Sequence, residues 1–367
     1  MRILYVGPTF RGSNTTSWRD AFIRLEHEVR SVDSFKLASW PVRLDRRLIA
    51  RMRRHPGTEK MRLLNQAVVQ ASRDFRPNLI FLAHGEYITA ATIRYCRQFG
   101  LVFAFMGDDI MNPINRSATF DEVIAEVDCI LTTNSWNVPE LRAAGVSRVE
   151  YSPWAYDPDI HFPAPITASD RLRFACDIGF VGTFRPERAD YLERVVSRCP
   201  GLVTRIWGGE WRKMRRWLYR IPRTRWPRLR ASVTPEEVWC EDYSKAIQSA
   251  GIVLGLLNHA NRDLHTARTF EIPACGGFML AERTPEHQLY FEEDREAVYF
   301  GDLAELIDKI DYYSRNDTER RKIAAAGYQR CIGSGYQYID RARAALNVFD
   351  EMGGGVAHRV GGSARHA

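Results

Sequence analysis

Residues 78–83, Asn-Leu-Ile-Phe-Leu-Ala, form an apolar run in which hydrophobic and polar residues do not alternate. Similar runs occupy residues 3–6, 101–106 and 129–133, and helix-like segments lie between them. Continuous apolar runs are typical of strands buried on both faces of a parallel sheet. The alternation of such runs with helical segments predicts an α/β fold.

The same pattern starts again after a proline-rich stretch. Residues 152–165 contain four prolines, which is typical of a linker. Further apolar runs follow at residues 177–183, 203–209, 252–257, 277–281 and 297–300. We therefore expect two doubly wound parallel-sheet domains, at 1–150 and 173–335, joined by a linker over 151–172. A helix over 336–352 and a disordered, glycine-rich tail over 353–367 complete the expected organisation.

Composition excludes several classes of protein. The chain has 367 residues, of which 45% are hydrophobic, so it can bury a substantial core. No window approaches the roughly 18 consecutive apolar residues of a membrane span, and the N-terminal run is too short for a signal peptide. A cytoplasmic protein is expected. The seven cysteines form no CxxC pair, which favours free thiols over disulfides or a zinc site.

Two basic stretches, residues 43–62 and 211–230, carry much of the net charge of +7. Both mix arginines with apolar residues, and the second also contains tryptophans. Such segments indicate either contact with an anionic membrane surface or a solvated basic face. No motif for reading nucleic acid accompanies the charge.

A glycine turn is predicted where the strand at residues 177–181 ends. Gly182 lets the backbone approach a ligand, and Thr183 and Arg185 add a hydroxyl group and a cation. An ordinary βα turn with solvated arginines is the alternative interpretation. The segment lacks the Gly-Lys-Ser/Thr of a Walker A loop, and no GxGxxG motif supports a nicotinamide site.

The most informative segment is residues 268–280, Arg-Thr-Phe-Glu-Ile-Pro-Ala-Cys-Gly-Gly-Phe-Met-Leu. It places Arg268 and Glu271 three residues apart, on one face of a helix. A helix end closed by glycine before a strand would explain the glycine pair alone. It would not explain the paired Arg and Glu.

This segment resembles the R-x-F-E-x-x-A-C-G signature of glycosyltransferases of group 1, in particular the spore-maturation-protein-like enzymes. The resemblance covers about residues 174–350 and implies a GT-B fold, with two Rossmann-like domains facing a cleft. It also implies that the helix at 336–352 crosses back onto the N-terminal domain. This chain has Gly335 at a position where the family usually has a His or another polar residue.

The resemblance implies a role for each matching residue. Glu271 would bind the ribose hydroxyls of a nucleotide-sugar, Arg268 the pyrophosphate and Asp263 the donor sugar. The loop at Trp207 would cover the base, with the indole stacking on it or lying in the core. The expected donor-binding set is Gly182, Thr183, Arg185, Trp207, Gly208, Arg268, Thr269 and Glu271. No metal or other cofactor is expected. Asp157-Pro158-Asp159 spells DxD, the motif of metal-dependent glycosyltransferases with another fold, but it lies in the linker.

In the N-terminal half, polar residues follow the predicted strands. Because carboxyl ends of parallel strands meet at one edge of a sheet, these residues are candidates for acceptor binding or proton transfer. The expected catalytic residues are His84, Asp108, Asp109 and Asp263, and the expected acceptor-side residues are Gly7, Gly12, Ser13 and Glu86. Capping and loop carboxylates are the alternative interpretation of the acidic residues.

Together these observations predict an enzyme that moves a sugar from a nucleotide-sugar to a glycan, lipid-linked or envelope acceptor. The resemblance favours retention of the anomeric configuration without a metal. Two alternatives stay open: a non-catalytic nucleotide-sugar or envelope-binding relative, and an epimerase or phosphorylase on the same fold.

Overall fold

The computed structural model describes residues 1–34, 58–83, 85, 87–116, 119–211, 225–234 and 236–353. The chain divides into two compact units. Unit 1 contains Met1–Trp154, His259–Asp263 and the chain from Tyr338 onward, and unit 2 contains Ala155–Asn258 and Leu264–Gln337. The chain first passes from unit 1 to unit 2 after Trp154, within the range predicted for the linker.

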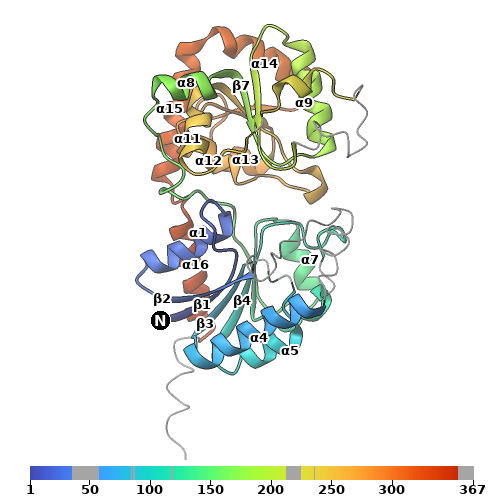
Figure 1. The fold of residues 1–367 in the computed structure, drawn as a ribbon, viewed down its shortest axis with the longest axis vertical. Coiled ribbons are helices and arrows are strands. Elements are labelled where there is room, and N and C mark those ends of the chain that lie inside the picture. Colours follow the sequence, from blue (N-terminus) through green and yellow to red (C-terminus); the bar gives the residue numbers. More distant parts are fainter. Residues whose placement is uncertain are drawn as a thin grey trace, which may run out of the picture. The chain divides into compact units, whose positions relative to one another are not determined.

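Unit 1 is built on a six-stranded parallel sheet with the order β2-β1-β3-β4-β5-β6 (Figure 1). Its strands are β1 (Arg2–Gly7), β2 (Glu28–Asp33), β3 (Leu79–Ala83), β4 (Leu101–Met106), β5 (Cys129–Thr132) and β6 (Val149–Tyr151). Its helices are α1 (Asn14–Arg24), α4 (Thr58–Phe75), α5 (Ala90–Cys96), α6 (Phe120–Ile124), α7 (Asn137–Ala143), η3 (His259–Asn261) and α16 (Tyr338–Glu351).

The two faces of this sheet have different cores. Alternate residues of β1, β3 and β4 pack against α4 and α5, with Leu64 and Val68 among the buried partners. The opposite face is aromatic: Trp18 of α1 lies 5.0 Å from Phe81 and 5.1 Å from Phe105, between ring centroids. Helix α16 covers the same face, where Tyr338 meets Trp18. Burial on both faces explains why these strands read as continuous apolar runs.

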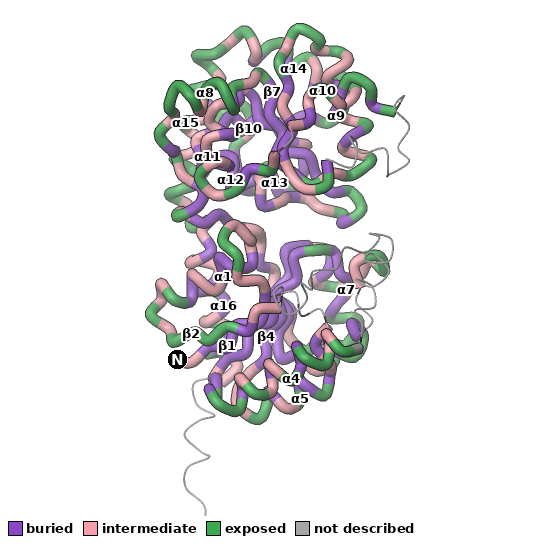
Figure 2. Tube along the Cα trace, viewed as in Figure 1, coloured by how far each residue is buried: buried purple, intermediate pink, exposed green. Residues whose placement is uncertain are grey.

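Unit 2 has a five-stranded parallel sheet with the order β11-β10-β9-β7-β8. Its strands are β7 (Cys176–Val181), β8 (Thr204–Trp207), β9 (Ala250–Gly255), β10 (Met279–Glu282) and β11 (Val298–Phe300). Its helices are α8 (Ala168–Phe174), α9 (Pro186–Arg198), α10 (Leu229–Ser232), α11 (Glu241–Ser249), α12 (Arg268–Ala274), α13 (Pro285–Tyr290), α14 (Leu303–Arg315) and α15 (Asp317–Gly333). Strands β7 and β10 are largely buried (Figure 2).

Several boundaries differ from the predictions. Strand β2 was missed because it is largely exposed, so it lacks the apolar run of a buried strand. Helix α1 begins at Asn14, with Ser13 as its N-cap, so the loop after β1 ends at residue 13. The predicted linker over 151–172 already contains most of helix α8, where Thr167 and Asp170 form a capping box.

Most of the two basic stretches lies outside the described residues. Within the second stretch, Trp211 and Trp226 are buried in the core of unit 2, so neither indole is presented to a membrane surface. The Trp211 Nε1 donates to the Gly182 carbonyl oxygen at 2.6 Å. Among the described residues, no helix combines the length and apolarity that crossing a membrane requires.

An ion-pair network centred on Arg283 joins Glu293 to Glu305 at the start of α14. Arg283 donates to both Glu293 and Glu305, and hydrogen bonding to Arg283 lowers the pKa of Glu305 to about 2 from an ordinary 4.5. A carboxylate with a lowered pKa stabilises the fold above pH 4.5, and this contribution is lost as the pH falls towards 2.

We therefore expect Glu305→Gln to cost about 1 kcal/mol at neutral pH, since the pair is partly solvated. Between pH 4.5 and 2, the stability of the wild type should fall more steeply than that of the variant. Thermal unfolding across this range measures both slopes. Asp308→Asn, an exposed change on the same helix, is the control, and equal slopes for Glu305→Gln and wild type would contradict the prediction.

Candidate functional site

The strand order of unit 2 reverses direction between β7 and β9. In open α/β sheets, ligands bind where the connections diverge in this way, outside the carboxyl ends of the strands. The segment from Gly182 to Arg185 leaves β7 at this point, and Leu256 and Leu257 leave β9. The glycine turn predicted from the sequence is therefore at the switch point of the sheet.

Two glycines pack backbone against backbone beside this point. The Gly182 N–H donates to the Trp207 carbonyl oxygen at 3.0 Å, and the Phe184 N–H donates to the Gly209 carbonyl oxygen at 2.9 Å. A Cβ atom added to Gly208 would lie 2.2 Å from the Gly182 carbonyl oxygen, and Gly208 has a φ of +131°. Only glycine fits there, because the backbones of the turns after β7 and β8 are in direct contact.

Two arginines are bound to the same turn. Arg188 donates to carbonyl oxygens on both sides of the switch point: Thr183 at 3.3 Å, Leu256 at 3.1 Å and Leu257 at 3.1 Å. The Arg268 Nε donates to the Val181 carbonyl oxygen at 2.8 Å. Sequence reasoning assigned no role to Arg188, because a contact with β9 cannot be read from its position at the start of α9.

Glu271 is the centre of a buried cluster. Its side chain is 1% exposed, and its Oε2 accepts hydrogen bonds from Arg268 and from the Tyr243 hydroxyl, the latter at 2.9 Å. Burial opposes ionisation, but the charge of Arg268 and the Tyr243 hydrogen bond keep the pKa of Glu271 below its ordinary value. Arg268 is 29% exposed, so it is the member of the cluster that reaches the surface.

The linker supplies a further member of this cluster. The His161 Nδ1 accepts from the Asp157 N–H at 3.1 Å, which leaves the proton on Nε2, 3.6 Å from Glu271 Oε1. Burial lowers the pKa of His161, which favours the neutral ring. Asp157 closes the turn by accepting from the Asp159 N–H at 3.1 Å. The Asp-Pro-Asp segment is thus a turn that places His161, which sequence reasoning missed.

Two residues of the expected donor-binding set lie in the core instead. Trp207 is 1% exposed and packs against Phe174, so its indole offers no face to a base. Thr269 is also buried, with its hydroxyl 2.9 Å from His287 Nε2. Thr183 and Arg185 are exposed, as a ligand contact requires.

In unit 1, the loop after β1 is closed by its own hydrogen bonds. The Thr16 hydroxyl donates to the carbonyl oxygens of Pro8 at 3.0 Å and Phe10 at 3.1 Å. The Tyr5 hydroxyl also donates to Pro8, at 2.9 Å. Gly7 is buried, whereas Gly12, at a φ of +93°, and Ser13 are partly exposed. His84 and Glu86 lie outside the described residues.

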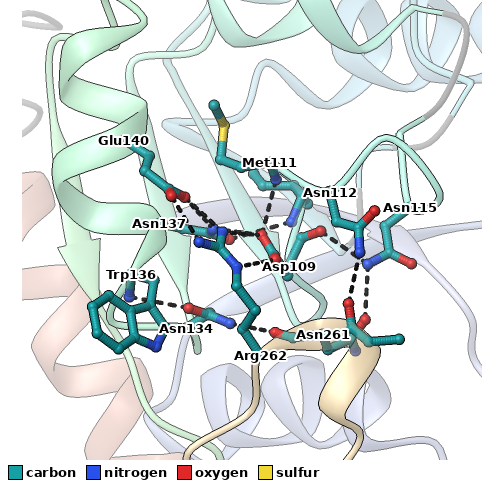
Figure 3. A network of polar contacts seen from close by, with 12 residues as sticks. Asp109, Met111, Asn112, Asn115, Asn134, Trp136, Asn137, Glu140, Asn261 and Arg262 are labelled. Atoms are coloured by element: carbon teal, nitrogen blue, oxygen red, sulfur yellow. Dashed lines mark hydrogen bonds and ion pairs between the residues drawn. The ribbon is translucent and has the colours of Figure 1, made fainter.

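The Asp109 carboxylate is buried and engaged in an ion pair. Its side chain is 1% exposed, and both carboxylate oxygens accept from Arg262, at 2.7 Å and 3.0 Å (Figure 3). Although burial opposes it, hydrogen bonds from Arg262 and Asn137 keep the pKa of Asp109 below its ordinary value. In this arrangement both carboxylate oxygens of Asp109 are engaged by Arg262, and the catalytic role expected of Asp109 stays a prediction. Asp108 is exposed, with Oδ1 2.5 Å from Asn261 Nδ2, and Asp263 is partly exposed.

The class of fold follows from the two parallel sheets and is shared with solved structures. A sucrose-phosphate synthase from Thermosynechococcus elongatus is 12% identical and has a TM-score of 0.65, with 96% of this chain and 99% of that chain covered. Anabaena HepE, solved with UDP and glucose, is 15% identical with a TM-score of 0.65, covering 96% and 100%. The chain therefore has the two-domain GT-B fold.

The chain also resembles an epimerase of known structure, and part of it matches a family model. The UDP-GlcNAc 2-epimerase from Neisseria meningitidis is 11% identical with a TM-score of 0.53, covering 96% of this chain and 100% of that one. Residues 186–347 match the model of the glycosyl transferase-like family. No curated relative matches the sequence. The family match lies mainly in unit 2 and extends through most of α16, and it includes Arg268 and Glu271.

Proposed function

We propose that this chain is a GT-B glycosyltransferase whose unit 2 binds a nucleotide-sugar donor. The observation that carries the proposal is the placement of Arg268, which is fixed to the carboxyl end of β7 beside the Gly182 turn and partly exposed. A guanidinium at the carboxyl end of a strand suits a diphosphate, because its planar fork matches phosphate oxygens. Exposed Thr183 and Arg185 extend the same edge.

The comparisons support this reading of the site. HepE has been solved with UDP and with UDP-glucose, and the glycosyl transferase-like family model covers α12. The same family match favours transfer over the epimerase alternative. The likeness to spore-maturation-protein-like enzymes in particular stays a prediction.

The proposed chemistry is electrostatic. As the bond between sugar and diphosphate breaks, negative charge grows on the leaving diphosphate, and Arg268 and Arg185 stabilise it. Glu271 sets the orientation of Arg268 through the buried ion pair. We propose retention of configuration, with the leaving diphosphate assisting loss of the acceptor proton. We also propose that the acceptor is a glycan, a lipid-linked molecule or an envelope component. The protein is proposed to be cytoplasmic, with the basic stretches at residues 43–62 and 211–230 in contact with anionic membranes.

Calorimetric titration with UDP-, GDP-, ADP-, CMP- and dTDP-sugars tests the donor site. We expect one nucleotide to bind, with UDP-glucose as the first probe. Arg185→Ala should weaken binding about tenfold, which corresponds to roughly 1.4 kcal/mol for one lost phosphate contact. It should leave the unfolding temperature unchanged because the side chain is exposed.

Arg198→Ala, at the other end of α9, is the matched control and should bind as the wild type does. If the folded protein binds none of these nucleotide-sugars, the donor-site assignment is contradicted. Binding with no hydrolysis of the donor, in which water would take the sugar and the nucleoside diphosphate would leave, would instead favour a non-catalytic nucleotide-sugar-binding protein.

A further inference from the structure

A short segment of the chain belongs to a different unit from the residues on either side of it. His259–Asp263 groups with unit 1, whereas Asn258 and Leu264 belong to unit 2. Within unit 1 the segment lies at the carboxyl ends of β4 and β5 (Figure 3).

Asparagine side chains of unit 1 bind the backbone and side chain of this segment. Asn112 Nδ2 donates to the Ala260 carbonyl oxygen and Asn134 Nδ2 to the Asn261 carbonyl oxygen, both at 2.6 Å. Asn115 Nδ2 donates to Asn261 Oδ1 at 2.8 Å. Since these contacts come from separate loops of unit 1, they specify one conformation of the segment.

Arg262 adds a charged contact. Besides its two hydrogen bonds to Asp109, it donates to Glu140 Oε1 and Oε2, both at 2.8 Å. Asn137 Nδ2 also donates to Asp109, at 2.7 Å, so the buried carboxylate is fully surrounded by donors. Arg262 has a φ of +50°, in the left-handed region that non-glycine residues adopt infrequently. In this conformation its guanidinium forms ion pairs with two carboxylates.

The anchored segment is part of the loop from residue 256 to residue 267. This loop connects the carboxyl end of β9 to α12, the helix that carries Arg268 and Glu271. It begins at the carbonyl oxygens that Arg188 binds. The anchored residues and the carbonyl groups bound by Arg188 therefore belong to one continuous loop.

We propose that Arg262 is a positioning residue: its ion pairs with Asp109 and Glu140 hold the β9–α12 loop in the conformation that the transfer step requires, whereas donor affinity does not depend on them. The inference rests on the proposed function. It assigns Asp109, which the sequence offered as a candidate for proton transfer, to loop anchoring together with Glu140.

Two variants of the full-length chain test the anchor. Arg262→Ala removes the cation, and Arg262→Ala with Asp109→Asn also removes the buried charge that the first change leaves unpaired. Amide hydrogen exchange should show faster exchange over residues 259–263 in both variants. Arg295→Ala, which removes an exposed arginine paired with Glu292, is the matched control and should exchange as the wild type does.

UDP-glucose is the probe for the functional half of the proposal. We expect hydrolysis of UDP-glucose, in which water takes the glucosyl group and UDP leaves, to be at least tenfold slower in both variants, with a dissociation constant within about twofold of wild type. Arg262→Lys should recover only part of the rate, because an ammonium cannot form both bidentate contacts.

The inference would be overturned if amide exchange over residues 259–263 were the same in the variants as in the wild type. It would also be overturned if the variants lost affinity for UDP-glucose by the same factor as they lost rate. A wild-type chain that neither binds nor turns over any nucleotide-sugar would instead contradict the proposed function, while the exchange experiment would still decide whether Arg262 anchors the loop.

Discussion

Gly208→Ala is expected to destabilise unit 2 by roughly 2–4 kcal/mol, the combined cost of steric overpacking and a strained backbone. The new Cβ would lie 2.2 Å from a carbonyl oxygen of the backbone, which cannot move aside as the end of a flexible side chain can. Because that carbonyl belongs to Gly182, the change should also displace the proposed phosphate-binding turn. We expect nucleotide-sugar binding to fall below detection even at temperatures where the variant is folded.

The neighbouring glycine provides a matched control. A Cβ on Gly209 would come no closer than 3.9 Å to its nearest neighbour, a Glu237 carboxylate oxygen. Gly209→Ala should therefore change the unfolding free energy by less than about 0.5 kcal/mol and keep donor binding. Thermal unfolding and calorimetry of the two variants measure the difference, and equal behaviour would refute the packing argument.

Arg268→Met is expected to cost about 3–5 kcal/mol, because it leaves the Glu271 carboxylate buried without its counter-charge. The Tyr243 hydroxyl would then be its nearest hydrogen-bond donor. The destabilisation should shrink at acid pH, since a protonated carboxyl has no charge to bury. Donor binding should be lost together with the guanidinium.

A double variant separates the structural effect of this change from its functional effect. Arg268→Met with Glu271→Leu replaces the buried pair by apolar groups, which is often neutral for stability. We expect most of the lost stability to return, measured by denaturant unfolding, while nucleotide-sugar binding stays absent. Recovery of binding in the double variant would show that Arg268 does not contact the donor.

Local patterns in the sequence were sufficient for much of the fold. The buried strands β3, β4 and β9 are apolar runs because helices cover both faces of each sheet. The Gly182 turn and the spacing of Arg268 and Glu271 were also readable, because a turn at a strand end and two residues on one helix face are local features. Strand β2 could not be predicted from an apolar run because it is largely exposed, and helix α8 lies in a stretch predicted to be a linker.

The environment of the candidate residues could not be read from the sequence. Asp109 follows a buried strand, as a catalytic carboxylate would, but its partner Arg262 lies 153 residues further along the chain. Trp207 ends a strand beside a glycine pair, yet it packs into the core. In each case the role depends on which distant residue occupies the adjacent space.

By itself, the sequence determined that the chain forms two parallel-sheet halves with a glycine turn and a paired Arg and Glu in the second. These features depend on the hydrophobic period of each segment and on residues no more than a few positions apart. Only the tertiary structure decided that Glu271 faces inward, that Arg268 reaches the surface and that Arg262 neutralises Asp109. Burial and ion pairing are set by contacts between segments far apart in the chain, and those contacts exist only once the sheets have assembled.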